Sequence, residues 1–161
     1  MSTRTIHIET ELPTDADRVW DSMKQLASFL YVTRGILGFP VLAGRTEPIR
    51  PGEIATGWLF AFHVLPVHRH TIEVRDVEEQ SRSIRTEEHG GVLRRWDHTL
   101  HVEPMGEARC RYSDTVIIDA GILTPVVCVV ATGLYRYRHR RWQRLVRRHL
   151  LPTGPQAPTS P

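Results

Sequence analysis

Apolar and polar residues alternate near the N-terminus and then change their spacing. Over residues 4–12 the apolar positions fall on every second residue, which predicts a β-strand. After Pro13 they recur every three or four residues, so we expect an amphipathic helix over about 15–26 and a second short helix over 27–33. The apolar stripe on these helices consists of Val19, Trp20, Met23, Leu26, Ala27 and Leu30.

The middle of the chain, residues 40–119, returns to a period of two. Turn residues at Pro66, at Gly90-Gly91 and over 104–107 divide this region, so we expect about six strands. Short connections between consecutive strands favour antiparallel neighbours. The region therefore predicts an antiparallel meander.

A long helix is expected at the C-terminal end. Thr124 and Pro125 form a favoured helix start, and the apolar series then continues to about residue 150. The whole order of elements predicts an α+β fold, with a curved antiparallel sheet of about six to seven strands and its helices grouped to one side. We expect one domain over residues 1–150, followed by a disordered Pro-rich tail over 151–161.

Composition limits location and class. The chain has 161 residues, of which 40% are hydrophobic and 24% charged, and its net charge is +3, which is typical of a globular domain. The first twelve residues contain no apolar segment like that of a secretory signal. The most apolar stretch, residues 116–135, is interrupted by Asp119, Gly121 and Pro125, so we expect no membrane-spanning helix. The expected location is cytoplasmic.

Several strings within this order resemble the START/Bet v 1-like superfamily, also called SRPBCC or polyketide cyclase/dehydrase-like. The strings are IHIETELPTDADRVWDSM, GGVLRRWDHTLHVEP, RYSDTVIIDAG and YRYRHRRWQRL. The resemblance covers about residues 4–150. It implies a helix-grip fold, in which the sheet wraps around the C-terminal helix. Members of the superfamily bind lipids, quinones or hormones, or cyclise polyketides, so the resemblance implies an internal cavity.

Large aromatic residues recur on strand faces that the long helix is expected to cover. If the sheet curves around that helix, the space between them suits an apolar or amphipathic small molecule. The residues expected to contact this ligand are Trp58, Phe60, Phe62, His68, His70, Trp96, Leu100, Tyr112, Val127 and Leu134. For the aromatic members of this set, packing in the core is the alternative interpretation.

His98 and Asp114 are the candidate catalytic pair. A short turn that places Val102 opposite Cys110 sets His98 directly across from Asp114. Opposite residues on one sheet face lie about 4.5–5.5 Å apart at Cβ, which is within hydrogen-bonding reach for these side chains. A carboxylate in that position raises the pKa of the histidine and fixes its tautomer, as a general acid or base requires. The alternative is a purely structural polar pair.

Metal and cofactor chemistry is not expected. His68, His70 and His98 are assigned to inward faces and could together bind zinc, but their spacing is not diagnostic. The two cysteines, Cys110 and Cys128, match no metal-binding spacing. The sequence has no Gly-rich phosphate loop and no nucleophile elbow.

The predicted C-terminal helix is rich in arginine between Arg136 and Arg148. Its arginines are Arg136, Arg138, Arg140, Arg141, Arg144, Arg147 and Arg148. A solvated helix face is the simplest interpretation, and contact with an anionic membrane surface is the alternative. Nucleic-acid binding is not expected, because no groove-reading motif accompanies the charges.

Two functions follow from these patterns. The first is a carrier or sensor that binds an apolar or amphipathic molecule, such as a lipid, an isoprenoid quinone or a polyketide-like compound. The second is a cyclase or dehydrase-type enzyme that uses His98 and Asp114 for proton transfer. The sequence sets neither the ligand nor the oligomeric state.

Overall fold

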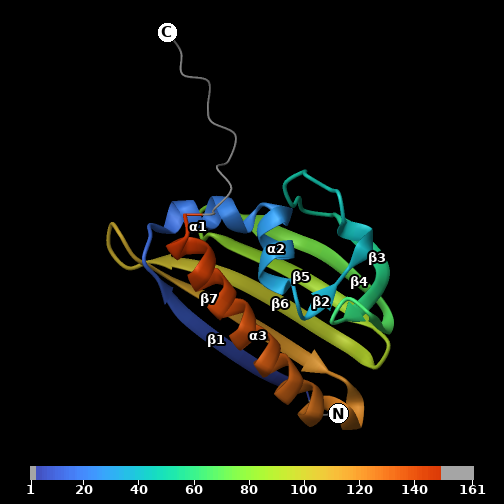
Figure 1. The fold of residues 1–161 in the computed structure, drawn as a ribbon. Helices are drawn as coiled ribbons and strands as arrows, with labels where there is room; N and C mark the ends of the chain where they lie inside the picture. The colour runs from blue at the N-terminus through green and yellow to red at the C-terminus, as the bar shows by residue number, and fades with distance from the viewer. Residues whose placement is uncertain (1–2, 150–161) are drawn as a thin grey trace.

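The computed structural model describes residues 3–149, and Figure 1 shows their arrangement. Three α-helices are present in this range: α1 (Ala16–Met23), α2 (Leu26–Thr33) and α3 (Thr124–Arg147). The strands are β1 (Arg4–Leu12), β2 (Leu37–Gly38), β3 (Ile54–Ala61), β4 (Leu65–Glu78), β5 (Ser83–Gly90), β6 (Leu93–Pro104) and β7 (Cys110–Asp119). Two 3-10 turns, Pro40–Leu42 and Gly121–Leu123, complete the order. The expected tail over 151–161 lies outside the described residues.

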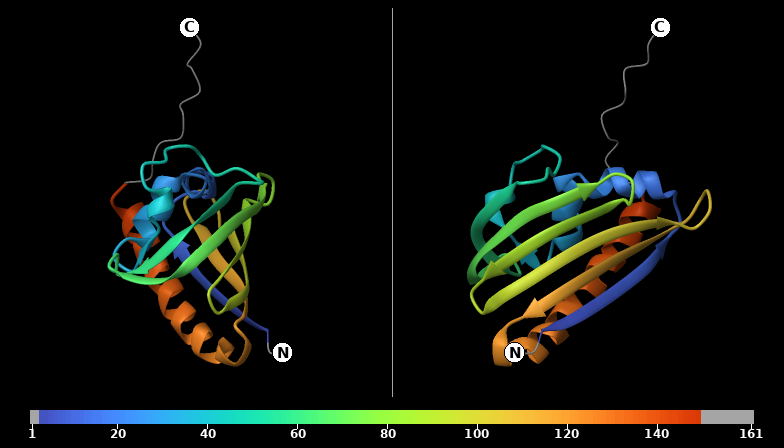
Figure 2. Two further views of the ribbon diagram at one scale, coloured as in Figure 1. Left: turned by 90° about the vertical axis from the view of Figure 1, so that its right-hand side faces the viewer. Right: turned by 180° about the vertical axis from the view of Figure 1, so that it is seen from behind.

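All seven strands form one antiparallel sheet in the order β1-β7-β6-β5-β4-β3-β2. The sheet curves, and α3 lies across its concave face while α1 and α2 cover one end (Figure 1). Seen from behind, the convex face of the sheet carries no helix (Figure 2). The helix-grip fold is therefore confirmed. None of the helices in the range 3–149 is both long and apolar enough to cross a membrane.

The main core lies where α3 crosses β1 and β7 and meets the first two helices. Strand β7 turns every second side chain inward, and Cys110, Tyr112 and Val116 are fully buried there. Trp142 and Leu145 of α3 pack at the same end of the molecule. Each such side chain contributes about 1.5–3 kcal/mol on burial, so this junction fixes α3 on the sheet.

The local boundaries differ little from expectation. The first helix ends at Met23, and a break at Lys24 and Gln25 precedes α2. At the start of α1 the Asp15 carboxylate accepts a hydrogen bond from the Arg18 amide at 2.9 Å, which satisfies one of the free N–H groups of the first turn.

The inward face of β3 was predicted wrongly. Trp58 is 51% exposed and lies on the convex side together with Ile54 and Thr56. The inward positions are the small or aliphatic residues Ala55, Gly57, Leu59 and Ala61. A Cβ at Gly57 would lie 3.0 Å from the Val41 side chain and 3.2 Å from Phe39, so a side chain there would displace these residues. The segment after β2 thus packs close against β3 and leaves no inward space for large aromatic residues.

The register of β6 and β7 also differs from the expectation. Val102 pairs with Tyr112, and Pro104 pairs with Cys110, so the strands are shifted by two residues relative to the predicted pairing. A shift of two keeps every side chain on its predicted face, because the side-chain period of a strand is two. It changes only which residues are direct neighbours.

Candidate functional site

Asp114 on β7 is the centre of a buried polar network, and its side chain is 1% exposed. Its Oδ1 atom accepts hydrogen bonds from His98 Nε2 at 2.6 Å and from the Tyr112 hydroxyl at 3.1 Å. Its Oδ2 atom accepts from His139 Nε2 on α3 at 2.8 Å. An ionised carboxylate can only accept, so both histidines carry a proton on Nε2.

The surroundings of Asp114 keep it ionised. Burial raises its pKa, but the nearby charge of Arg138 and the hydrogen bonds from His139 and His98 outweigh burial and lower the pKa below its usual value. Burial also raises the pKa of Tyr112 well above its usual value, so Tyr112 is a neutral donor. The network thus holds one negative charge with three donors around it.

Glu88 on β5 is a second buried carboxylate. It accepts a hydrogen bond from His70 Nε2 at 2.9 Å and another from the Thr86 hydroxyl at 2.8 Å. His68 Nε2 lies 3.1 Å from His70 Nδ1 and extends the network along β4. Burial raises the pKa of Glu88, but the hydrogen bond from His70 and the nearby imidazole of His98 lower it to about 2. Glu88 is therefore ionised at neutral pH.

His98 on β6 connects the two carboxylates. Its Nε2 contacts Asp114 and its Nδ1 lies 3.8 Å from Glu88 Oε1. Burial lowers the pKa of His98, while Asp114 and Glu88 raise it, and the net result is a pKa above the usual value. The imidazolium form is favoured between two negative groups.

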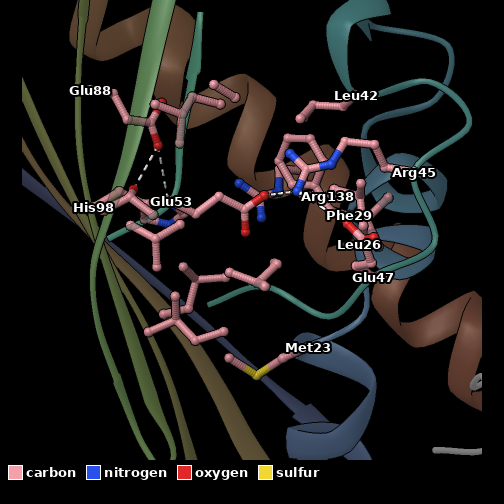
Figure 3. A pocket seen from close by; sticks show the side chains of 18 of the residues that line it. Met23, Leu26, Phe29, Leu42, Arg45, Glu47, Glu53, Glu88, His98 and Arg138 are labelled. Atoms are coloured by element: carbon pink, nitrogen blue, oxygen red, sulfur yellow. Dashed lines mark hydrogen bonds and ion pairs between the residues drawn. The ribbon is translucent and has the colours of Figure 1, made fainter. Parts of the chain in front are cut away.

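Two cavities lie between the sheet and α3. The larger has a volume of about 660 Å³ and the smaller about 90 Å³, with the smaller one shown in Figure 3. A volume of several hundred Å³ is in the range of small-molecule sites. The residues that line both cavities are Phe29, Ile72, Glu88, His98 and Arg138. The polar network therefore lies at the wall between the two spaces.

The larger cavity opens at a rim of exposed apolar side chains. Those on the sheet side are Phe62, Val67 and Val92, and those on α3 are Val126, Val129 and Val130. Deeper in the cavity the lining is also mostly apolar, with Leu59, Trp96 and Leu134 among its members. The space thus runs from an apolar mouth to a polar inner end.

The predicted ligand-contacting residues divide into two groups. The residues that line a cavity are Phe62, His68, His70, Trp96, Leu100, Val127 and Leu134. Trp58, Phe60 and Tyr112 line neither cavity. Tyr112 instead donates to Asp114 from within the core, and Trp58 faces away from the cavity. Of the predicted catalytic pair, His98 lines both cavities and Asp114 lies behind the cavity walls.

Sequence reasoning missed three residues of the site: Glu88, Arg138 and His139. Arg138 was placed with the solvated arginines, although Tyr135, Arg138 and Trp142 share one helix face at spacings of three and four residues. Glu88 follows Ile84 and Thr86 on the inward face of β5. The alternation of side chains along this strand is therefore sufficient to predict that Glu88 points inward.

Metal binding is not supported by the geometry that is described. No group of three or more His, Cys, Asp or Glu residues within 3–149 is placed to hold a metal ion. His68 contacts His70, His70 donates to Glu88, and His98 donates to Asp114, so the imidazoles do not converge on one empty point. Cys110 and Cys128 are both buried and free.

The curved sheet around α3, with cavities between them, is a fold of the SRPBCC/START-like type. Solved structures of similar fold include an aromatase/cyclase (ZhuI) from Streptomyces sp. R1128, with a TM-score of 0.69, 12% identity, and coverage of 95% of this chain and 99% of that one. Norcoclaurine synthase from Thalictrum flavum, in complex with dopamine and hydroxybenzaldehyde, has a TM-score of 0.65 at 19% identity, and the match covers 92% of this chain and 88% of that one. A START superfamily protein from Mycobacterium smegmatis has a TM-score of 0.65 at 12% identity, and the match covers 90% of this chain and 98% of that one.

The chain belongs to a family described as a domain of unknown function, DUF8410, whose family model matches residues 10–146. No curated protein matches the chain. The structural similarities, all at low identity, establish the fold.

Proposed function

We propose that the protein binds an apolar or amphipathic small molecule in the larger cavity and acts as its carrier or sensor. The observation that carries this proposal is the space of about 660 Å³ with an apolar rim and a buried polar network at its inner end. Such a site favours a molecule that is mostly apolar and has one polar group. A lipid, an isoprenoid quinone or a polyketide-like compound fits this description.

Binding of Nile red, a neutral apolar dye, tests the proposal directly. We expect saturable binding by the wild type and loss of most binding in Leu134→Trp, since Leu134 lines the cavity and the larger ring occupies its volume. Arg136→Trp is the matched control, because Arg136 is exposed on the same helix and lines neither cavity. Equal binding by the two variants, or no binding by the wild type, would contradict the proposal. Native mass spectrometry of the purified protein would identify a co-purified ligand.

Catalysis of the cyclase or dehydrase type is the second candidate. It is favoured by the position of His98, which lines both cavities and has a raised pKa, so that it could donate a proton to a bound molecule. Asp114 would then act as a positioning residue. Incubation of the recovered ligand with fresh protein distinguishes the two functions: conversion that is lost in His98→Gln supports an enzyme, and an unchanged ligand supports a carrier.

Peripheral association with an anionic membrane is the third candidate. It is favoured by the exposed apolar rim, together with Arg136, Arg140 and Arg144, which are exposed on the same helix as part of that rim. Co-sedimentation with liposomes, with and without anionic lipid and across a salt series, is the test. Liposome binding that is independent of lipid charge would contradict a role for the arginines.

A further inference from the structure

Arg138 of α3 is buried and has no partner for its guanidinium group. The residue is 5% exposed, and no residue in the described part of the chain forms a hydrogen bond or a salt bridge with it. Its Nε atom is fully enclosed and unsatisfied. A buried charge without a partner is strongly unfavourable, and a guanidinium remains charged in proteins, so the missing partner requires an explanation.

The nearby carboxylates do not supply that partner. Asp114 is already bound by His98, Tyr112 and His139, and Glu88 is bound by other residues of the network. Both carboxylates stabilise the charge of Arg138 from a distance, but neither lies within 4.0 Å of its nitrogens. The guanidinium of Arg138 therefore has no carboxylate partner among the described residues.

Arg138 lies next to the space that a ligand in the larger cavity would occupy. The residue lines both cavities and thus lies at the inner end of the larger one, opposite the apolar mouth. The Tyr135 and Phe29 rings lie 5.0 and 5.9 Å from Cζ and cover part of the guanidinium with apolar surface. Figure 3 labels Arg138 together with Glu88 and His98 among the residues around the smaller cavity.

We propose that the larger cavity takes an amphipathic carboxylate, such as a fatty acid or an aryl-substituted acid, and that Arg138 binds its carboxylate. This inference rests on the proposed ligand-binding function and specifies the chemical class of the ligand. The planar fork of a guanidinium matches a carboxylate with two parallel hydrogen bonds. An anionic group also gains more from an unpaired buried cation than a hydroxyl or an ester does. The apolar part of the ligand then lies against Trp96, Val127 and Leu134 toward the mouth.

Competition between a matched pair of ligands tests the inference. Dodecanoate and 1-dodecanol displace Nile red from the wild type at neutral pH, and we expect dodecanoate to bind at least roughly tenfold more tightly. Arg138→Gln should lose this preference and keep its affinity for 1-dodecanol. Arg136→Gln, an exposed arginine on the same helix, should keep the preference.

The outcomes separate this inference from the proposed function. If the wild type binds Nile red but shows no preference for dodecanoate, or if Arg138→Gln retains the preference, the inference is wrong and the cavity function stands. If the wild type binds neither Nile red nor either competitor, both fail. Should Arg138→Gln not fold, Arg138→Lys keeps the charge and loses the planar fork, and we expect a reduced preference. The wild-type comparison decides the inference in either case.

Discussion

His98 Nε2 lies 2.6 Å from Asp114 Oδ1, although the two residues are not opposite each other in the sheet. His98 pairs with Val116, and Asp114 pairs with Leu100, so the contact is diagonal across β6 and β7. Diagonal neighbours on one face are still within reach of long side chains. In this arrangement His98 lines the cavities and Asp114 lies behind it. His139 of α3 donates to the second oxygen of the Asp114 carboxylate. The sheet and α3 are thereby joined through one buried charge.

Asp114→Asn should strongly destabilise the protein. The amide keeps the size of the side chain but cannot accept from three donors or offset the charge of Arg138. We expect a loss of about 3–5 kcal/mol in the free energy of unfolding, measured by urea denaturation. Asp97→Asn is the control, because Asp97 forms a partly exposed pair with Arg95, and its loss should cost less than about 1 kcal/mol. Similar losses in both variants would contradict a central role for Asp114.

The dependence of stability on pH should report Glu88. Its pKa is lowered from 4.5 to about 2 in the folded protein, so the group stabilises the fold above pH 4.5. That contribution is lost as the pH falls from 4.5 toward 2, because the unfolded chain then binds the proton more tightly. Glu88→Gln should flatten the stability curve in this window, measured by chemical denaturation at each pH. Glu87→Gln should flatten it much less, because the Arg75 hydrogen bond that lowers the pKa of Glu87 is exposed to solvent. An unchanged slope in Glu88→Gln would show that Glu88 is not held as a buried anion.

Gly90 at the β5–β6 turn should not tolerate a side chain. Its φ is +153°, and a Cβ there would lie 2.2 Å from the Arg69 carbonyl oxygen. Gly90→Ala therefore adds a backbone clash to a backbone strain of about 1–3 kcal/mol, and thermal denaturation should show a large fall in melting temperature. Gly106 also has a positive φ, +95°, but open space surrounds the position of an added Cβ. The melting temperature of Gly106→Ala should therefore fall only by the effect of the backbone strain. Equal falls in the two variants would argue against a close approach of Gly90 to β4.

Tryptophan fluorescence should distinguish the two faces of the sheet. Trp96 lines the larger cavity and stacks near Tyr135, with ring centroids 6.2 Å apart. Trp58 lies on the convex face. Energy transfer from tryptophan to bound Nile red should fall markedly in Trp96→Phe and much less in Trp58→Phe. A larger loss in Trp58→Phe would mean that the dye binds outside the proposed cavity.

The element order and most inward faces could be predicted from the sequence. Periodicity assigned Trp96, His98 and Leu100 to one face of β6 and Tyr112 and Asp114 to one face of β7, as the structure has them. The face of β3 could not be assigned in this way. Aromatic residues there alternate with small ones, and hydrophobicity alone favours the aromatic side. The small residues of β3 face inward because Phe39 and Val41 pack closely against them. This contact joins segments that are separate in sequence, so strand periodicity does not reveal it.

The site shows the same division. Side-chain alternation is enough to put a histidine and a carboxylate on neighbouring strands with the same orientation, because side-chain direction has a period of two and survives a register shift of two residues. Which of the two faces the cavity depends on how the strands and α3 pack together. The same packing also decided that Arg138, one arginine among several on α3, is buried with its guanidinium free while Arg136 and Arg140 are exposed. The rotation of α3 about its axis determines which of its arginines face the curved sheet and are buried. Close packing between α3 and the sheet holds the helix in that rotation.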